Sequence, residues 1–598
     1  MSIRAVLRYF RGEWLTLAAT TGISIVGALF DALSVVMIVG LADAVSREEG
    51  RLDRSVGPFS ISLSHGAAAL VAITAVAASV LAVVAVSQLR ARSVTRWTMA
   101  KRLELIEAFI DADWSLQSRD RVGALQTDLS YATYASFLLG GLINAARGAI
   151  GLAILIGAAF VFNVVAASLV LVLGAVISLV LRPVNRAVKR RSAMSAAQTK
   201  RLNEQVAELT HLARDIRVFG VQDTFRQRFV APVTELGASE RRTAFLSSLP
   251  TPIYQAMAMT LIIAGLYASS RLTSIEPGLL GIIALLMLRS VSYGQQLQTA
   301  VTTLHQAAPA LDIIDTSLER LRTRERSFGE DRLTEVSSIS LDRLEFAYDD
   351  GEPVLKRISS EFRQGEIVGL IGRSGSGKST LAQLLLRLRS GQGGTVRVNG
   401  QPAEQFAPSA WSRAISFVPQ EPQLMYGTIH DNIAFLRSWL TRSDVIAAAV
   451  AAGIHDTITE LPHGYDTVVG QGARDLSGGQ RQRLGIARAL AGHPSVIVLD
   501  EPTSALDQQS EAIIQETLSR IRGEALIIVI AHRLTTLAIC DRVVLLEDGI
   551  IERECPPELI SGVVAESALG EPSGASTSHP VAQSDDAGHT AEPQTTRG

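Results

Sequence analysis

Six long apolar stretches constrain the fold of this chain more than any other feature of its sequence. About 20 consecutive apolar residues let an α-helix cross the hydrocarbon core of a bilayer, and each stretch reaches about that length. The sequence therefore predicts six transmembrane helices, although the tight junction at Asn163 leaves the division between the third and fourth open. The stretches lie at about 14–44, 62–89, 134–160, 163–182, 251–270 and 277–298.

The distribution of basic residues predicts how these helices are oriented. The two long polar segments, 90–133 and 183–250, are rich in Lys and Arg. The hairpin between the third and fourth helices carries neither residue, and the hairpin between the fifth and sixth carries only Arg271. Because basic residues accumulate on the cytoplasmic side, both termini and both long segments are predicted to be cytoplasmic. The first outer loop fits less well, since it contains Arg47, Arg51 and Arg54.

Changes in composition divide the chain into further parts. Residues 1–13 are predicted to form a short amphipathic helix at the lipid head groups, and the long apolar run that follows argues against a secretory signal. The membrane domain is predicted at 14–320, and helical spacing in its polar segments indicates helices that extend beyond the bilayer. A linker at 321–336 precedes a soluble domain at 337–562. The tail at 563–598 has almost no large apolar residues, which predicts disorder.

The soluble domain contains a phosphate-binding motif, G-x-x-x-x-G-K-[ST], at residues 372–379. The apolar run 366–371 predicts a buried strand before it, and 380–387 predicts a helix after it. Glycines in such a loop let backbone N–H groups surround phosphate oxygens at a helix N-terminus. Lys378 would then reach the β- and γ-phosphates, and the Ser379 hydroxyl would bind Mg²⁺. This context favours a nucleoside-triphosphate site over a Gly/Ser-rich surface turn.

An acidic pair follows another apolar run in the same domain, at 496–499. Asp500 ends this predicted strand, where a metal ion held by the phosphate loop would lie. Glu501 comes next and is placed to orient or deprotonate an attacking water. Such a pair is by itself often only a strand end, but together with Lys378 it indicates ATP or GTP hydrolysis.

The segment 476–483, Leu-Ser-Gly-Gly-Gln-Arg-Gln-Arg, resembles the signature motif of ATP-binding cassette (ABC) ATPases. Ser477, Gly478 and Gly479 precede a helical pattern and again place small residues at a predicted helix N-terminus. In this family the signature binds ATP held by a partner domain. The resemblance therefore implies a dimer with ATP between its subunits: a homodimer is expected, and a heterodimer with a second half-transporter stays open.

Other landmarks of the family occur in the same order along the chain. Tyr348 resembles the aromatic residue that stacks on adenine, Gln420 the glutamine that contacts Mg²⁺ and water, and His532 the histidine that touches the γ-phosphate. The loop 504–507 resembles the one that crosses the dimer interface. The resemblance implies the cofactors ATP and Mg²⁺, with Glu501 and His532 as catalytic residues. The implied Mg²⁺ ligands are Ser379, Gln420 and Asp500. The implied ATP contacts are Tyr348, Gly372, Ser374, Gly375, Gly377, Lys378, Ser379, Thr380 and Gln420, with Ser477, Gly478, Gly479 and Asp507 from the partner subunit.

Six spans ahead of one ATPase domain resemble the exporter branch of this family, as a half-transporter. Residues 208–220 resemble a segment of that branch's second cytoplasmic loop. Two positions depart from the pattern: Gln471 replaces the usual glutamate in a loop thought to relay the nucleotide state, and Tyr426 replaces a phenylalanine. No peptidase-like domain precedes the first span, which argues against a processing-and-export enzyme.

The resemblance implies an ATP hydrolase coupled to transport by alternating access. Walls rich in Ala, Val, Leu and Gly favour an apolar or amphipathic solute, such as a lipid, peptide or drug-like molecule. An importer on the same scaffold and an ATP-gated channel or receptor regulator are alternatives. The six spans argue against a soluble ATPase acting on DNA or ribosomes, and a net charge of −2 argues against a nucleic-acid partner. Abundant Ala, Arg and Val point to a bacterial source, hence to the plasma membrane.

Two ionisable residues stand inside the predicted spans, Asp31 and Arg147, with Asn144 and Gln255 as polar neighbours. Charged groups in a membrane are costly and usually face a cavity or a partner. One expectation is that they line the transport cavity. The alternatives are that Asp31 and Arg147 form a structural pair, or that Arg147 extends to the inner interface.

Overall fold

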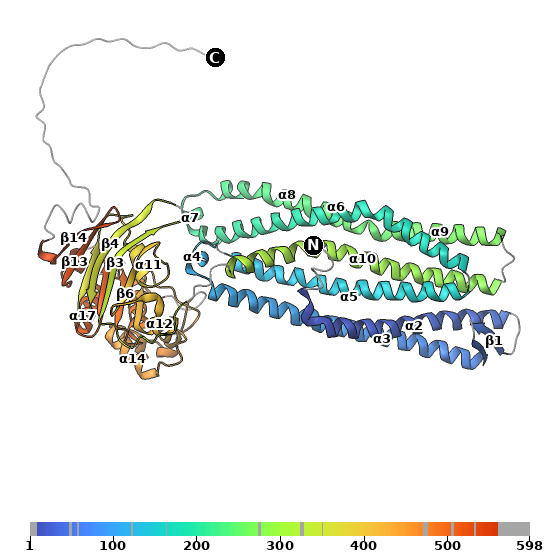
Figure 1. Ribbon diagram of the computed structural model, residues 1–598, viewed down its shortest axis with the longest axis horizontal. Coiled ribbons are helices and arrows are strands. Elements are labelled where there is room, and N and C mark those ends of the chain that lie inside the picture. The colour runs from blue at the N-terminus through green and yellow to red at the C-terminus, as the bar shows by residue number, and fades with distance from the viewer. Residues whose placement is uncertain are drawn as a thin grey trace, which may run out of the picture. The chain divides into compact units, whose positions relative to one another are not determined.

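The structure is a computed structural model that describes residues 9–46, 51–56, 59–120, 123–162, 164–272, 277–322, 328–349, 351–470, 476–503, 508–531 and 534–559. The chain divides into two compact units, Met1–Glu325 and Arg326–Gly598. The first unit is built from long helices and the second from sheets covered by short helices (Figure 1). This confirms the predicted fold class, a helical membrane domain followed by an α/β P-loop domain.

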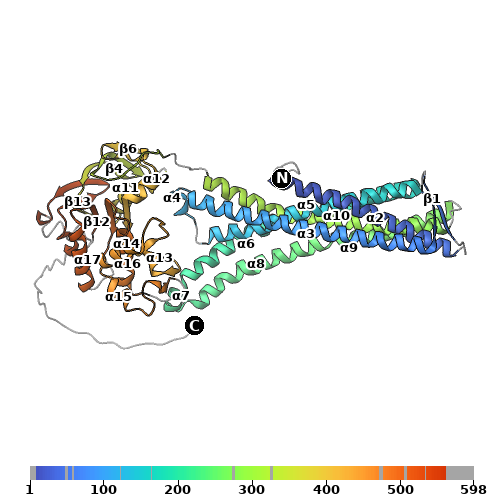
Figure 2. The ribbon, with the colours of Figure 1, turned by 90° about the horizontal axis from the view of Figure 1, so that it is seen from below.

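The long helices of the first unit lie side by side along most of its length (Figures 1 and 2). Its helices are η1 (Arg11–Glu13), α2 (Trp14–Ser46), α3 (His65–Asp111), α4 (Trp114–Gln117), α5 (Ala124–Phe162), α6 (Val164–His211), α7 (Ala213–Val218), α8 (Gln222–Ser248), α9 (Pro250–Leu272) and α10 (Pro277–Arg322).

The six predicted spans fall on α2, α3, α5, α6, α9 and α10. Among the described residues, three helical segments are long and apolar enough to cross a membrane: Arg11–Ala42, His65–Asp111 and Ala124–Phe160. The spanning role of α6, α9 and α10 stays a prediction. The third and fourth stretches divide at the expected place, because α5 ends at Phe162 and α6 begins at Val164.

One feature of the helical unit departs from the all-helical expectation. A hairpin of β1 (Arg51–Val56) and β2 (Phe59–Ser64) connects α2 to α3. Phe59, Ile61 and Leu63 alternate with serines, and this period of two favours a strand over a helix. The second span, predicted from residue 62, consequently begins at His65.

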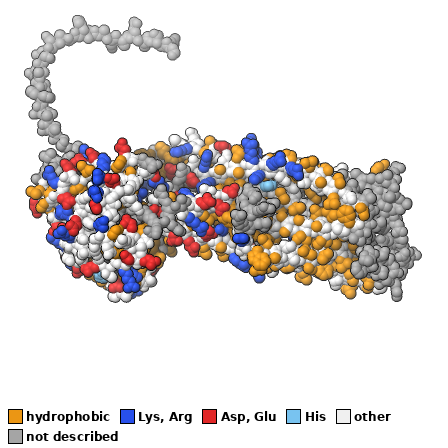
Figure 3. Space-filling model, viewed as in Figure 1, with side chains coloured by type: hydrophobic (Ala, Val, Ile, Leu, Met, Phe, Trp, Pro, Cys, Tyr) orange, Lys and Arg blue, Asp and Glu red, His pale blue; other side chains and the backbone are white. Residues whose placement is uncertain are grey.

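Several helices are longer than a bilayer crossing requires, and their extension beyond the bilayer stays a prediction. With 47 residues in α3 and 48 in α6, each is about 70 Å long at 1.5 Å per residue, against a hydrocarbon core of about 30 Å. Figure 3 shows hydrophobic side chains over the part of this unit towards β1, and acidic and basic side chains over the opposite part. Leu70, Ile73 and Leu81 of α3 are more than 60% exposed, as expected of a lipid-facing surface.

Close packing of α5 against α10 forms the centre of the helical unit. Leu138, Leu139 and Ile143 of α5 are fully buried in a core that also holds Leu311 of α10. Gly148 lets the two backbones approach, because a Cβ atom there would lie 2.9 Å from the backbone nitrogen of Leu297.

The first described residues are held against α3 and α10. The rings of Phe10 and Trp97 lie 5.3 Å apart, Glu13 is buried and accepts a hydrogen bond of 2.8 Å from Ser93, and the Tyr9 hydroxyl donates to Asp315. Residues 11–13 form a single 3-10 turn that leads into α2. The amphipathic helix predicted over 1–13 otherwise lies outside the described residues.

The second unit is organised around a six-stranded sheet in the order β14-β13-β5-β12-β11-β8. Its central strands are parallel and buried on both faces, which explains their continuous apolar sequences. Side chains of β5 alternate between two cores: Ile367 and Ile371 face one, Val368 and Leu370 the other. The strands are β5 (Ile367–Ile371), β8 (Ile415–Val418), β11 (Val496–Asp500), β12 (Leu526–Ile530), β13 (Arg542–Glu547) and β14 (Ile550–Cys555).

A second, antiparallel sheet has the order β4-β3-β6-β7. Its strands are β3 (Ser338–Ala347), β4 (Pro353–Arg363), β6 (Gly393–Val398) and β7 (Gln401–Pro402), and a short ladder pairs β9 (Gly427–Thr428) with β10 (Val468–Val469). The helices are α11 (Lys378–Leu385), η2 (Ala403–Gln405), α12 (Pro408–Ala414), α13 (Ile429–Ala434), α14 (Arg442–Ala451), α15 (His455–Thr459), η3 (Gly464–Asp466), α16 (Gly478–Leu490), α17 (Gln508–Ile521), α18 (Leu534–Leu537) and η4 (Pro557–Leu559).

Candidate nucleotide-binding site

The phosphate loop connects β5 to α11, as the sequence predicts. Gly372 has φ +152°, and a Cβ atom there would overlap the carbonyl oxygen of Leu546. Gly377 caps α11 with φ +108°. Both positions require glycine, since other residues rarely adopt such backbone angles. The two glycines therefore allow the tight turn that leads into α11, and the N-terminus of a helix suits an anion.

Lys378 is the first residue of α11, and its side chain folds back over the loop. It is only 6% exposed, and its ammonium donates to the carbonyl oxygens of Gly372 (2.7 Å) and Arg373 (3.0 Å). Burial lowers the pKa of Lys378, and the carboxylates of Glu501 and Asp500 oppose this shift. The ammonium is thus held close to two acidic groups, where a phosphate could replace the carbonyl acceptors.

The acidic pair lies at the carboxyl edge of the parallel sheet. Asp500 is the last residue of β11, and Glu501 follows it with φ +46°, an uncommon angle for a residue with a side chain. Its backbone N–H donates to the Ile530 carbonyl at 3.0 Å. Gln420, which follows β8, donates from Nε2 to Glu501 Oε2 at 2.7 Å. Parallel strands bring their carboxyl ends to one edge, so three distant segments meet here.

Lys378, Asp500 and Glu501 line a cavity of about 400 Å³, whose lining does not include Gly372 or Gln420. The Tyr348 hydroxyl lies 2.9 Å from the Thr380 hydroxyl at its wall, and the Arg389 guanidinium lies over the Tyr348 ring, 4.7 Å from its centroid. Arg389 could not be predicted from the sequence, because no motif spacing connects it to Tyr348. The lining residues are Tyr348, Val354, Ser374, Gly375, Gly377, Lys378, Ser379, Thr380, Asp500, Glu501 and Ile530.

The signature residues begin a separate helix, α16. Ser477 and Gln480 form a reciprocal capping box: the Ser477 hydroxyl accepts from the Gln480 N–H at 3.2 Å, and the Gln480 side chain accepts from the Ser477 N–H at 2.9 Å. Ser477 and Gly478 are exposed, and the described lining of the cavity does not include them or Gly479. Asp507, His532 and Gln471 lie outside the described residues.

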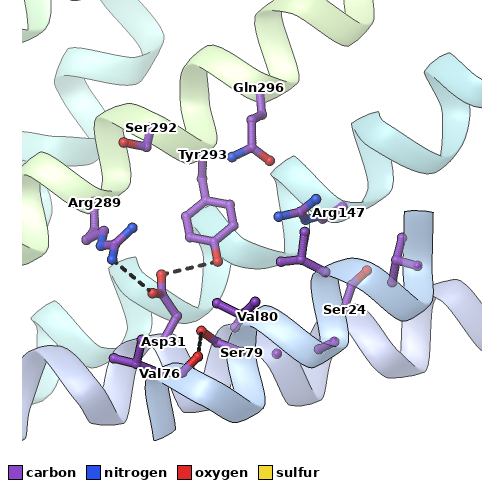
Figure 4. A pocket seen from close by; sticks show the side chains of 15 residues that line it. Ser24, Asp31, Val76, Ser79, Val80, Arg147, Arg289, Ser292, Tyr293 and Gln296 are labelled. Atoms are coloured by element: carbon purple, nitrogen blue, oxygen red, sulfur yellow. Dashed lines mark hydrogen bonds and ion pairs between the residues drawn. The ribbon is translucent and has the colours of Figure 1, made fainter. Parts of the chain in front are cut away.

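The membrane unit contains a second polar cavity (Figure 4). Asp31 accepts a hydrogen bond from the Tyr293 hydroxyl at 3.2 Å and pairs with Arg289 at 3.5 Å. The alternative that Asp31 and Arg147 form a structural pair is therefore wrong, because α10 supplies the partner. Arg147 lines the same cavity.

The two polar neighbours also have partners on other helices. Asn144 accepts from Arg90 at 3.0 Å, and Gln255 donates to Gln295 at 3.2 Å. Neither residue lines the cavity that holds Asp31 and Arg147. Both hydrogen bonds join one helix of the unit to another.

Both units match families of known proteins. Residues 18–294 match the family described as the ABC transporter transmembrane region, and residues 355–504 match the family described as ABC transporter. The chain is 33% identical over 408 residues to the ATP-dependent lipid A-core flippase of Alkalilimnicola ehrlichii, covering 65% of this chain and 67% of that protein.

Two other relatives match over a shorter length. The cyclolysin secretion/processing ATP-binding protein of Bordetella pertussis is 44% identical over 219 residues, which is 36% of this chain and 31% of that protein. The mycobactin import ATP-binding/permease protein of Mycobacterium tuberculosis is 42% identical over 226 residues, 38% of this chain and 26% of that protein. The chain thus matches only about a third or less of the length of these two relatives.

The fold agrees with a solved structure of a bacterial Atm1-family ABC exporter with ATP bound. The TM-score is 0.76 at 23% identity, and the match covers 96% of this chain and 100% of that one. A transmembrane region and an ATP-binding domain therefore share one chain, which is an integral membrane protein. By its matched regions and its relationship to the lipid A-core flippase, the chain belongs to the ABC transporter family.

Proposed function

We propose that this chain is one subunit of a dimeric exporter that moves an apolar or amphipathic solute at the expense of ATP. The observation that carries the proposal is the cavity in which Lys378, Asp500 and Glu501 converge, in a chain that also contains a membrane-spanning unit. The relatives named for lipid A-core flipping and cyclolysin secretion support transport of a lipid or peptide.

The residues around the cavity suit ATP. We propose that the adenine stacks on Tyr348, whose ring contacts the Arg389 guanidinium and lies perpendicular to the Phe346 ring, and that the phosphates occupy the loop 372–380. Burial keeps Lys378 close to the loop, and its ammonium would exchange carbonyl acceptors for phosphate oxygens. Charge-assisted hydrogen bonds of this kind are stronger than neutral ones.

Oxygen donors at the same edge of the sheet fit Mg²⁺. The Ser379 hydroxyl, the Asp500 carboxylate and the Gln420 amide oxygen are hard ligands of the type that Mg²⁺ prefers, and Gln420 offers its oxygen because its nitrogen donates to Glu501. When bound, Mg²⁺ would neutralise charge on the phosphates.

Glu501 is the proposed general base. The hydrogen bond from Gln420 fixes one of its carboxylate oxygens, and its left-handed backbone conformation fixes the direction in which the side chain leaves the strand. A carboxylate held in this way can accept a proton from water that attacks the γ-phosphate. His532 is proposed to contact the γ-phosphate.

A second subunit is proposed to complete each ATP site. The exposed start of α16, with Ser477, Gly478 and Gly479, would bind the phosphates of ATP held by the partner, and Asp507 would lie at the same interface. A homodimer has two such sites, and a heterodimer with another half-transporter is the alternative. ATP binding would then close the dimer, and hydrolysis would reopen it, giving alternating access.

The membrane orientation and the direction of transport are proposals as well. The Lys and Arg distribution favours cytoplasmic termini and a cytoplasmic ATPase domain, in a bacterial plasma membrane. Import is a second candidate, because the mycobactin relative is named for import.

The test is ATP turnover by the purified chain in lipid nanodiscs, with wild type beside Glu501→Gln and a matched surface control, Glu516→Gln. Glu516 is an exposed residue of α17 that pairs, among the described residues, with Arg520 on the same helix. We expect Glu501→Gln to lower turnover at least a hundredfold, the range of a general base, while ATP stays bound and the dimer closed. Wild-type turnover in this variant would contradict the role of Glu501.

The solute and its direction need a second measurement. Lipids, peptides and hydrophobic compounds are added to the nanodiscs, and any compound that stimulates turnover is followed in inverted vesicles. Accumulation inside the vesicles on addition of ATP supports export. Efflux from them indicates import. Binding of ATP without turnover, in wild type and in every lipid tested, would favour an ATP-gated regulator instead.

A further inference from the structure

The cavity lined by Asp31 and Arg147 has a charge imbalance that the ATPase chemistry does not use. Four helices form it: α2 with Asp31, α3 with an apolar wall, α5 with Arg147, and α10 with Arg289 and Tyr293 (Figure 4). Its volume is about 210 Å³, room for a chemical group considerably larger than one water molecule. Among the described lining residues, two guanidinium cations face one carboxylate, which leaves one positive charge uncompensated.

The partners of each charged group identify which arginine carries that charge. Asp31 is only 7% exposed and pairs with Arg289, while the Tyr293 hydroxyl donates to the same carboxylate. The Asp31 carboxylate is therefore already paired with Arg289. Within the described part of the chain, Arg147 donates no hydrogen bond and makes no ion pair, although it lines the cavity and is only partly exposed. An arginine in a membrane span without a counter-ion is costly.

The serine hydroxyls that line the cavity donate to carbonyl oxygens of their own helices, and that of Ser292 donates to the Leu288 carbonyl (3.5 Å). The Ser24 hydroxyl donates to the Thr20 carbonyl (2.6 Å) and the Ser79 hydroxyl to the Val76 carbonyl (2.8 Å). Gln296 lies on the same side of the Tyr293 ring as Arg147 (Figure 4). The Gln296 amide therefore adds a hydrogen-bond donor to the lining that includes Arg147.

The opposite wall of the cavity is apolar and continues onto an exposed surface. Val76, Val80 and Val83 of α3 line the cavity and are 40%, 54% and 36% exposed. Leu81 on the same helix is 69% exposed, so hydrocarbon surface extends outwards from the polar site. A ligand with an anionic head and an apolar chain satisfies both walls, whereas a free inorganic anion satisfies only one.

We infer that this cavity binds the anionic head group, a phosphate monoester or carboxylate, of an amphipathic ligand, with Arg147 as the counter-ion and the chain of the ligand along α3. The inference rests on the proposed function, since it names the substrate class of the proposed transporter. A singly charged head group, such as a carboxylate or the monoanion of a phosphate monoester, brings the net charge of the cavity to zero, which removes the cost of the unpaired guanidinium.

The experiment measures equilibrium binding of radiolabelled dodecyl phosphate to the nucleotide-free chain in phosphatidylcholine nanodiscs. Unlabelled dodecyl phosphate, 1-dodecanol and inorganic phosphate are the competitors. We expect dodecyl phosphate to compete at least tenfold better than 1-dodecanol, and inorganic phosphate to compete weakly. Equal competition by 1-dodecanol would refute a charged site, and equal competition by inorganic phosphate would refute an amphiphile site.

Three variants assign the binding to the cavity. Arg147→Gln should weaken dodecyl phosphate binding at least tenfold, and Arg147→Lys should restore much of it by restoring the charge. Arg92→Gln is the matched control, because Arg92 is an exposed residue of α3 that does not line the cavity, and it should bind as wild type does. Equal affinity in wild type and Arg147→Gln would overturn the inference.

Folding and the proposed function are tested separately from this site. The thermal unfolding midpoint of each variant reports whether the protein is intact, and a folded Arg147→Gln protein that still binds dodecyl phosphate counts against the inference. Because binding is measured without nucleotide, selective binding in a chain that shows no ATP turnover would remove the proposed function and leave the head-group site standing. ATP turnover without selective binding would support the proposed function and refute the head-group site.

Discussion

The two units of this chain place polar side chains in different ways. In the ATPase unit, Lys378 bonds to the carbonyl of Gly372, six residues away, within one strand–loop–helix segment. In the membrane unit, Asp31 and its hydrogen-bond donor Tyr293 are 262 residues apart. The first arrangement is encoded by local spacing and the second by the packing of four helices. The two sites should therefore respond differently to substitution.

The largest expected effect is loss of ATP binding in Lys378→Ala. The ammonium is buried in the phosphate loop and bonded to two carbonyl oxygens there, and alanine removes its charge. Removing one member of a buried charge pair costs about 2–5 kcal/mol, or at least about a 30-fold rise in the Kd for ATP. Fluorescent ATP binding measures it, with Lys356→Ala on an exposed position of β4 as control. A change of less than threefold would show that the loop backbone suffices.

The second effect tests whether the stability of the membrane unit depends on the close approach of α5 to α10. Gly148→Ala should destabilise the protein by about 1–3 kcal/mol, the usual cost of overpacking, because its Cβ would meet the Leu297 backbone. Gly157→Ala in the same helix has no atom within 4 Å of its Cβ. It should stabilise α5 by up to about 1 kcal/mol through helix propensity. Unfolding midpoints should therefore move in opposite directions, and a shared direction would contradict this packing.

The third effect separates the ion pair of the membrane cavity from its surroundings. Asp31→Asn and Arg289→Gln should each destabilise the protein, and the double variant should recover part of the loss. The Arg289 side chain is 50% exposed, so the expected coupling is only about 0.5–1 kcal/mol. A double-mutant cycle on unfolding free energies measures it. Additive effects would mean that the pair is incidental.

The smallest effect concerns the two cysteines of the ATPase unit. Burial raises the pKa of the Cys540 thiol to about 12, so at pH 8 it is almost entirely protonated and unreactive. Maleimide should label the half-buried Cys555 in the native protein, and Cys540 only after unfolding. Because folding favours the protonated thiol, this contribution to stability is complete below about pH 9 and is lost as the pH rises towards 12. Native labelling of Cys540 at pH 8 would contradict its burial.

The sequence predicted the local parts of both units. The length of the apolar stretches predicted α2, α3 and α5 as spanning helices. A backbone that crosses a bilayer must form its hydrogen bonds within itself, and a helix does so. The phosphate loop was also predictable, since Gly372 and Gly377 adopt backbone angles that few other residues tolerate. The position of the acidic pair followed from the strand that it ends.

Contacts between distant segments were decided by the tertiary structure. The sequence suggested Arg147 as a partner for Asp31, but α10 places Arg289 and Tyr293 closer. It gave no sign of Arg389 over Tyr348, and it missed the hairpin of β1 and β2. The physical reason is common to these cases: spacing along one helix or strand fixes which side chains share a face, but only packing decides which faces meet. The ATPase unit was therefore largely readable from its motifs, whereas the chemistry of the membrane cavity became visible only when its four helices were packed together.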